Sequence, residues 1–249
     1  GAGGRVPGGR GGAVVGWGWG GGGHAFAVSE RGADVGAFDR SFEDLVEVRS
    51  MFAAINVAGE APDTATANAI RGTAYSLPFA DATFDRIIAA EIMEHLPEDE
   101  LAMSELFRVL KPGGLIAVTV PRWLPEKVNW ALSEDYHNVP GGHIRIYKGT
   151  ELRAKLEKQG LEYQGQHHAH GLHAPYWWLK CAVGVRNDNH PLVKAYHRML
   201  VWDMVKAPLA TRLAGKVLQP LVGTSFIVYL RKPLASSRAS DRPAPASGW

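Results

Sequence analysis

Short apolar segments alternate with amphipathic segments through most of this chain, and this alternation constrains the fold more than any other feature. Residues 33–39, 84–91 and 115–121 are short apolar runs, which are typical of strands that are buried in a sheet. Residues 97–110 carry acids first and apolar side chains at helical spacing, which predicts an amphipathic helix. Because strands separated by helices form βαβ units, the pattern predicts an α/β fold with a mainly parallel sheet.

The alternation extends over residues 13–233, which we expect to form one domain, as suits a chain of 249 residues with 46% hydrophobic composition. Two stretches, 122–149 and 170–220, do not fit the repeat and are predicted to be substrate-side insertions. The Gly-rich residues 1–12 and the Ser-, Pro- and Ala-rich residues 234–249 are expected to be flexible. The other elements that we expect are strands at 14–15, 67–72, 161–169 and 224–233, and helices at 24–31, 42–55 and 150–159.

The charge balance and the cysteine count exclude several classes of protein. With 27 basic and 25 acidic side chains the formal net charge is +2, which does not imply a nucleic-acid partner. The single cysteine, Cys181, excludes an internal disulfide framework and a zinc site built from several cysteines. We therefore expect a cytoplasmic protein. We expect no membrane partner, because the sequence lacks both a run of about 18 apolar residues and an apolar signal core.

A glycine-rich stretch, VVGWGWGGGGHAF, lies at residues 14–26, between the first expected strand and the first expected helix. Its segment Gly18-Trp19-Gly20-Gly21-Gly22 fits the pattern G-x-G-x-G, in which glycines let the backbone approach a ligand closely. Asp39 ends the second expected strand, where an acid can accept hydrogen bonds from both hydroxyls of a ribose. By itself the loop is compatible with a nucleotide-cofactor site, including a nicotinamide site, and with a chance match in a flexible leader.

The block at residues 76–121 is far more specific than the glycine loop. It contains Leu77-Pro78-Phe79, Phe84-Asp85, the segment Glu91 to His95 and the turn Leu110 to Gly114. Through these pieces the chain resembles the class I S-adenosylmethionine-dependent methyltransferases, and within them the type 11 branch that acts on small molecules. The resemblance covers residues 13–165 and the last strand. It implies a Rossmann-like, seven-stranded, mostly parallel sheet with helices on both faces, an antiparallel last strand and a helical insertion before that strand.

The resemblance also implies S-adenosylmethionine as cofactor and indicates where this methyl donor binds. The donor lies over the glycine loop in this family, and Asp39 would hold its ribose. Residues 73–74 would lie beside its adenine, and residues 91–92 beside its methionine end. His95 would face the site of methyl transfer or support the loop. The positions predicted to bind the cofactor are Gly16, Gly18, Gly20, Gly22, Asp39, Thr73, Ala74 and Glu91.

Two positions depart from the family pattern. The family usually has an acid at the position of Gly16, which helps to hold the donor's amino group, and another at Thr73, near the adenine amino group. Trp17 and Trp19 are also bulky for a loop that favours small residues. These departures leave two explanations open, namely a weakened or inactive donor site and an error in the sequence.

Six of the ten histidines fall between residues 137 and 173, in two segments that follow expected strands. Because both segments leave the sheet at its cofactor side, we expect them to meet above the methyl group. Methyl transfer needs alignment and often a base, and histidine suits that role near neutral pH. His143 is the favoured base, because two glycines precede it in a loop that faces the site. The catalytic candidates are Glu91, His95, Asp135, His143 and His170.

Other roles are open for these side chains. Histidines and carboxylates together can hold a divalent metal ion, but their spacing matches no recognised metal motif, so we predict no metal site. Any single histidine can instead cap a helix or bond to the backbone. The aromatic stretch 175–180 can stack on a sugar ring, or it can pack in the core or against a second copy of the chain. The predicted acceptor-binding residues are Tyr136, Arg145, His173, Tyr176 and Trp177.

Residues 121–137 and 173–184 resemble, more faintly, actinobacterial members of the family, some of which methylate sugar hydroxyls in methylated-mannose polysaccharide synthesis. We therefore predict an enzyme that O-methylates a small polar metabolite, with a carbohydrate as the specific candidate. The alternatives are C- or N-methylation of another small molecule, and a catalytically weakened methyltransferase-fold protein that binds or dimerises. The LKPGG turn and the segment 84–95 argue against a nicotinamide-dependent oxidoreductase. Residues 190–218 are expected to form helices that serve as a lid or a homodimer face.

Overall fold

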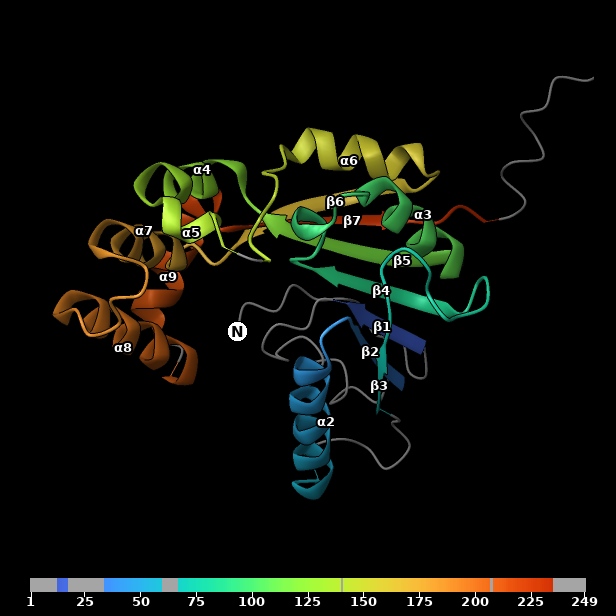
Figure 1. Ribbon diagram of the computed structural model, residues 1–249, viewed down its shortest axis with the longest axis horizontal. Coiled ribbons are helices and arrows are strands. Elements are labelled where there is room, and N and C mark those ends of the chain that lie inside the picture. Colours follow the sequence, from blue (N-terminus) through green and yellow to red (C-terminus); the bar gives the residue numbers. More distant parts are fainter. Residues whose placement is uncertain (1–12, 18–33, 60–66, 140, 207, 235–249) are drawn as a thin grey trace, which may run out of the picture.

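The computed structural model of the chain describes residues 13–17, 34–59, 67–139, 141–206 and 208–234. These residues form a seven-stranded sheet with the strand order β3-β2-β1-β4-β5-β7-β6 (Figure 1). The expected flexible segment 1–12, the expected helix at 24–31 and almost all of the expected tail 234–249 lie outside the described residues. The strands are β1 (Ala13–Trp17), β2 (Asp34–Asp39), β3 (Ala67–Arg71), β4 (Phe84–Ala90), β5 (Leu110–Pro121), β6 (Glu162–Ala169) and β7 (Ser225–Arg231).

The directions of the strands confirm the predicted Rossmann-like architecture. β1, β2, β3, β4 and β5 pair in parallel, whereas β7 runs antiparallel to both β5 and β6. The chain starts in the centre at β1, moves outward to β2 and β3, and then returns to the other side of β1 as β4. The strand order therefore reverses between β1 and β4, and ligands of open α/β sheets bind at the carboxyl ends of the strands beside such a reversal.

Helices connect the strands and form a separate group before β7. α2 begins directly after Ser41, whose Oγ accepts a hydrogen bond of 3.2 Å from the backbone N–H of Asp44, as expected for a capping residue. Glu43 and Asp44 lie in the first turn, where carboxylates interact favourably with the helix dipole. The helices are α2 (Phe42–Val57), the 3-10 turn η1 (Met93–His95), α3 (Asp99–Val109), α4 (Trp123–Leu132), α5 (Glu134–His137), α6 (Gly149–Lys158), α7 (His173–Val183), α8 (Pro191–Lys206) and α9 (Leu209–Val222).

Each face of the sheet has its own apolar core. Val15, Phe38 and Ile87 belong to the larger cluster, on the side of α3 and α6, whereas Val14 and Ile88 belong to a smaller cluster on the opposite side, where α2 lies (Figure 1). Neighbouring residues of β4 are thus buried on opposite faces, which explains why this strand is an unbroken apolar run in the sequence. The expectation of helices on both faces is confirmed.

β5 begins earlier than the sequence indicates. We expected a turn at the KPGG sequence and a strand from residue 115, but β5 starts at Leu110, and its pairing with β4 shifts register between Phe84 and Arg86. The backbone N–H of Gly113 donates to the carbonyl oxygen of Lys232 (2.8 Å), so the glycine segment remains paired within the sheet. Gly113 has a φ of 77°, a conformation that glycine adopts without strain.

Both expected insertions are helical, and they lie together beyond one end of the sheet (Figure 1). The first contains α4 and α5, and the second contains α7, α8 and α9. The indole N–H of Trp178 in α7 donates to the carbonyl oxygen of Pro125 in α4 (3.2 Å), and the hydroxyl of Tyr196 in α8 donates to the carbonyl oxygen of Leu172 (3.0 Å). These bonds hold the helical group together beyond the end of the sheet at which β5 finishes (Figure 1).

Candidate active site

A strained turn directly after β4 brings the acids and histidines of the EIMEH segment together. Glu91 has a positive φ of 50°, which is uncommon for a residue with a side chain and costs of order 1 kcal/mol or more. Its backbone N–H donates to the carbonyl oxygen of Thr119 in β5 (2.9 Å), which holds the turn against the sheet. The chain then enters η1, which places Glu94 and His95 beside the carboxyl ends of β4 and β5.

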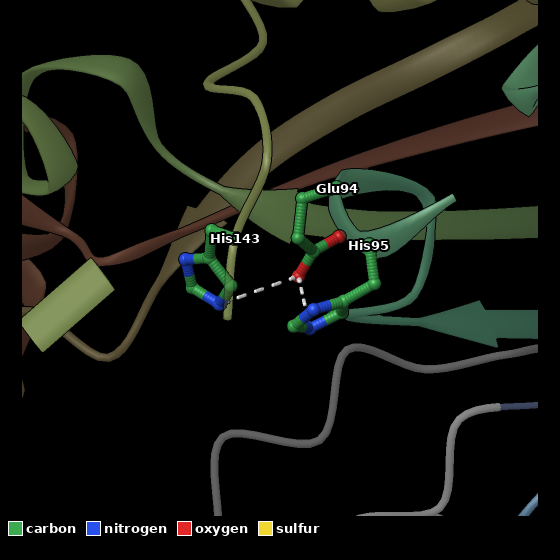
Figure 2. Close-up of side chains that lie close together, drawn as sticks. All are labelled: Glu94, His95 and His143. Atoms are coloured by element: carbon green, nitrogen blue, oxygen red, sulfur yellow. Dashed lines mark ion pairs between the residues drawn. The ribbon is translucent and has the colours of Figure 1, made fainter. Parts of the chain in front are cut away.

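Glu94, His95 and His143 form a compact cluster at this place (Figure 2). Oε1 of Glu94 lies 3.9 Å from Nε2 of His95 and 4.0 Å from Nε2 of His143. His143 comes from the segment after α5, and that segment is attached by a backbone hydrogen bond of 3.0 Å from the N–H of Ile144 to the carbonyl oxygen of Glu94. The Glu94 side chain is only 1% exposed, so the cluster has a buried carboxylate at its base.

In each histidine ring Nδ1, the nitrogen that does not face Glu94, lies beside an oxygen atom. Nδ1 of His143 lies 2.6 Å from Oε1 of Glu126, and Nδ1 of His95 lies 3.2 Å from the carbonyl oxygen of Gly142. In its neutral form, a histidine that donates from Nδ1 to such an acceptor has its lone pair on Nε2. Both Nε2 atoms face Glu94, so the two rings direct their lone pairs to one point (Figure 2).

Glu126 is buried at 3% exposure, yet four side chains bind it. Burial opposes ionisation of its carboxyl group, but the hydrogen bonds from His143, Trp130 and Asn129 outweigh this effect and hold its pKa below the usual value. The hydroxyl of Tyr136 also donates to Oε2 of Glu126 (3.2 Å). Glu126 is therefore a buried carboxylate whose main task is to orient His143 and the aromatic side chains around it.

The other two acids of the site have raised pKa values. Burial, together with the nearby charge of Glu91, raises the pKa of Glu94 well above its usual value. Desolvation by the surrounding protein is the main cause that raises the pKa of Glu91 to about 7, and the charge of Glu126 adds to it, although part of this side chain stays accessible to solvent. His143 and a hydrogen bond from Ser225 oppose the rise. Burial and the charge of His143 lower the pKa of His95, which keeps its ring neutral.

Two aromatic side chains stand beside the cluster. The ring of Tyr136 lies edge-on to His143 with 6.2 Å between centroids, and Trp177 of α7 lies 5.8 Å from Tyr136. The sequence predicted both residues as acceptor-binding residues, and the structure places them around His143. Tyr176, by contrast, faces α8, where it packs against Tyr196 and His197.

Several other predicted residues lie away from the cluster. The guanidinium of Arg145 pairs with Asp99 (2.6 Å) and donates to the carbonyl oxygen of Pro97 (2.8 Å), so it anchors its segment to the start of α3. Asp135 is exposed on α5, and no contact joins it to the cluster within the described residues. These two roles remain predictions without support from the geometry.

His170 and His173 are a pair at the end of β6, with ring centroids 5.3 Å apart. Nδ1 of His170 lies 3.2 Å from Oγ of Ser225, whose hydroxyl also interacts with Glu91. Burial lowers the pKa of His173. His170 thus reaches the site through Ser225, whereas His173 is connected to the site only through its contact with His170.

The donor half of the site is described only in part. Asp39 is the last residue of β2 and half-buried, and its Oδ1 accepts a hydrogen bond of 2.9 Å from the backbone N–H of Ser41. Its place beside the strand reversal fits the role of holding a ribose. Thr73 is exposed in the turn after β3, whereas Ala74 and Gly16 are buried. The predicted positions Gly18, Gly20 and Gly22, and the bulky Trp19, lie outside the described residues.

Three residues of the site are absent from the sequence-based predictions. Glu94 is next to His95 in the sequence, which is a local signal that the two side chains share a site. Glu126 lies three and four residues before Asn129 and Trp130, a spacing that places these polar side chains on one face of a helix. Ser225 carried no such signal, because its position beside Glu91 depends on β7 pairing next to β5.

Comparison with known proteins agrees with the predicted family. Residues 15–118 match a family model described as a methyltransferase domain. The methyltransferase GfsG of Streptomyces halstedii is 51% identical over 95 residues, which cover 36% of this chain and 32% of that protein. The sterol 24-C-methyltransferase of Eremothecium gossypii is 36% identical over 89 residues, covering 36% of this chain and 21% of that protein. A crystal structure of a putative methyltransferase from Bacillus halodurans has a TM-score of 0.58 and 21% identity over 90% of this chain and 94% of that chain.

The fold and the site therefore define a Rossmann-like domain of the methyltransferase type. The match over residues 15–118 and the fold support the predicted resemblance to the class I S-adenosylmethionine-dependent methyltransferases, a family whose cofactor is S-adenosylmethionine. The chain spans about a third and a fifth of the lengths of the two curated relatives named above. Among the described helices, none combines the length and the apolar character that crossing a membrane requires.

Proposed function

We propose that this chain transfers a methyl group from S-adenosylmethionine to a hydroxyl group of a small polar metabolite. The observation that carries the proposal is the cluster of ionisable side chains at the carboxyl ends of β4 and β5, in a methyltransferase domain. S-adenosylmethionine supplies a methyl group on a positively charged sulfur. The residues of this chain bind and orient the two reactants and remove the proton from the acceptor.

The polarity of the site supports a polar acceptor. Glu91, His95 and His143 offer acceptors and donors for hydroxyl groups, and Tyr136 and Trp177 offer aromatic faces beside them. This combination suits a carbohydrate, which presents hydroxyl groups at its rim and C–H groups on its faces, so we propose a sugar as the specific candidate. The name of one relative specifies C-methylation of a sterol, whereas the three polar side chains at this site favour oxygen as the methylated atom here.

His143 is the residue best placed to act on the acceptor hydroxyl. Glu126 binds Nδ1 of its ring and stabilises the positive charge that the ring would gain with a proton, as a carboxylate does behind a catalytic histidine. Its Nε2 faces the cluster. We therefore propose that the acceptor oxygen binds next to Nε2 of His143. Glu91 lies at the same site, and Ser225 and His170 position it from the side of β7.

A second candidate function follows from Gly16 and Thr73. Both positions lack the acid that the family usually provides for the donor. In the described part of the donor half, Asp39 is the acid that remains to bind the donor. In this alternative the chain keeps the fold and binds ligands or a second copy of itself without turnover.

The full chain, incubated with methyl-labelled S-adenosylmethionine and a panel of acceptors, tests the proposal. The panel contains sugars and other hydroxylated metabolites, together with amines and a sterol. We expect mass spectrometry to find the label on an oxygen atom of a polar acceptor. Label on carbon or nitrogen alone would overturn O-methylation. No transfer by a folded chain, with transfer restored by Gly16→Asp, would establish the weakened form.

A further inference from the structure

We propose that Glu94, His95 and His143 form a binding site for a divalent transition-metal ion of the zinc class. Neither the family nor the comparisons with known proteins assign such a site to this chain. The binding site itself follows from the geometry of these three residues alone. Its role in catalysis, which is to bind the acceptor oxygen, rests on the proposed function.

The three residues each direct one ligand atom to the same point. These atoms all lie within 4.8 Å of one another, and Oε1 of Glu94 lies 3.9 and 4.0 Å from the two Nε2 atoms. A metal with bonds of about 2.0–2.2 Å places its ligand atoms roughly 3–3.5 Å apart. Rotations of the two rings and the carboxylate that shift these atoms by about 0.5 Å would therefore complete the site.

The partners of the histidines already select the form of each ring that binds metal. Metal-binding histidines almost always donate their other ring N–H to a carboxylate or a backbone carbonyl, and this chain shows one of each. Nδ1 of His143 is bound to Glu126, and Nδ1 of His95 is bound to the carbonyl oxygen of Gly142. The two Nε2 lone pairs are thus oriented before an ion arrives.

Glu94 supplies an independent observation. Its carboxyl group is buried, and neither of its oxygens has a hydrogen-bond partner within the described part of the chain. A buried polar group without partners is costly, and so it usually has a missing ligand or ion. Because both Nε2 atoms face this carboxyl group, a cation between them would satisfy all three side chains at once (Figure 2).

The chemistry of the three ligands selects the kind of ion. Two imidazole nitrogens and one carboxylate oxygen suit zinc and other late first-row metals, whereas Mg²⁺ and Ca²⁺ prefer sets of oxygen ligands. Three protein ligands also leave a coordination position open for an oxygen atom of the acceptor.

An ion at this point would change the role of His143. It would polarise the O–H bond of the acceptor and ease the loss of its proton to solvent. The lone pair on Nε2 of His143 cannot bind an ion and accept a proton together. With the ion bound, His143 is therefore a ligand, and Glu126 is a positioning residue behind it.

Titration of the untagged full chain tests the site without any methylation assay. After dialysis against a chelator, Zn²⁺ is titrated by calorimetry and Co²⁺ by visible absorption, which reports nitrogen and oxygen ligands directly. We expect one ion per chain. His143→Ala and Glu94→Gln should weaken binding at least 100-fold, and Glu126→Gln should weaken it 10- to 100-fold because an outer partner is lost.

His167→Ala serves as the control, because His167 stacks on Tyr229 outside the cluster and the substitution should leave binding unchanged. Circular dichroism checks that each variant is folded. Absence of binding by the wild-type chain, or binding that survives both His143→Ala and Glu94→Gln, would overturn the metal site. Methyl transfer that is unaffected by chelator would overturn its catalytic role and leave the proposed function standing. Metal binding without methyl transfer to any acceptor would contradict the proposed function alone.

Discussion

The donor half and the acceptor half of the site are built differently. On the donor side, around β1, β2 and β3, Asp39 is the single described acid in a predicted binding position. On the acceptor side, after β4 and β5, Glu91, Glu94, Glu126 and two histidines interact within one cluster. On the acceptor side, each ionisable side chain therefore interacts with several others, whereas the described donor side has separate contacts. Substitutions should therefore act cooperatively in one half and individually in the other.

The largest expected effect comes from His143→Ala. This substitution removes the proton acceptor or metal ligand and leaves the buried Glu126 without its partner, so kcat should fall about 100- to 10,000-fold. The rate of labelled-methyl transfer to the identified acceptor measures the effect. His167→Ala is the matched control, because His167 stacks on Tyr229 away from the cluster and should retain activity. Similar losses in both variants would show that the cluster has no special role.

Asp99→Ala tests the buried charge network that holds the segment carrying His143 in place. Asp99 is buried and binds Tyr147, Lys155 and Arg145, which tie the segment that carries His143 to α3. Removal of one partner from a buried charge network should lower the free energy of unfolding by about 3–5 kcal/mol. Urea unfolding measures this change. Asp188→Ala removes only the ion pair of an exposed carboxylate with Lys180, so its cost should be far smaller than that of Asp99→Ala. Equal costs would contradict the assigned network.

Asp39→Asn tests the donor half. Loss of the charge should weaken hydrogen bonds to the ribose by about 1.5–3 kcal/mol, which lowers donor affinity roughly 10- to 100-fold. The shift in melting temperature on adding S-adenosylmethionine reports this change. Glu47→Gln, on the exposed face of α2, is the control. An unchanged shift for Asp39→Asn would mean that the donor binds elsewhere.

The pH dependence of stability gives the smallest effect. Burial opposes ionisation of Asp99, but its bonds to Lys155, Tyr147 and Arg145 dominate and lower its pKa below the usual 3.8. A lowered folded-state pKa means that Asp99 stabilises the fold fully above its unfolded pKa. This contribution disappears as the pH falls through the folded value. Urea unfolding at several acidic pH values should show this loss in the wild type and a flatter profile in Asp99→Asn. Identical profiles would contradict the assignment.

The fold was largely predictable, because its signals are local and repeated. β4 is an unbroken apolar run in the sequence, as expected for a strand buried on both faces. α2 is preceded by a capping residue and carries acids in its first turn. The early start of β5 was not predicted, because Gly113 pairs with Lys232, which is distant in the sequence.

The site was predictable only in part. His143, His95 and Glu91 could be placed near the carboxyl ends of the strands from topology, and the structure brings them together. Glu126 and Ser225 were missed because their roles depend on tertiary contacts between α4, β7 and the loop around residue 143. Arg145 was expected to bind the acceptor, but its guanidinium forms an ion pair with Asp99.

The central claim is that the domain still binds its methyl donor despite Gly16 and Thr73. Isothermal titration of the folded full chain with S-adenosylmethionine tests this claim most directly. The account predicts one donor bound per chain, with an affinity that falls in Asp39→Asn. No heat of binding from a folded wild-type chain would contradict it, whether or not Gly16→Asp restores binding.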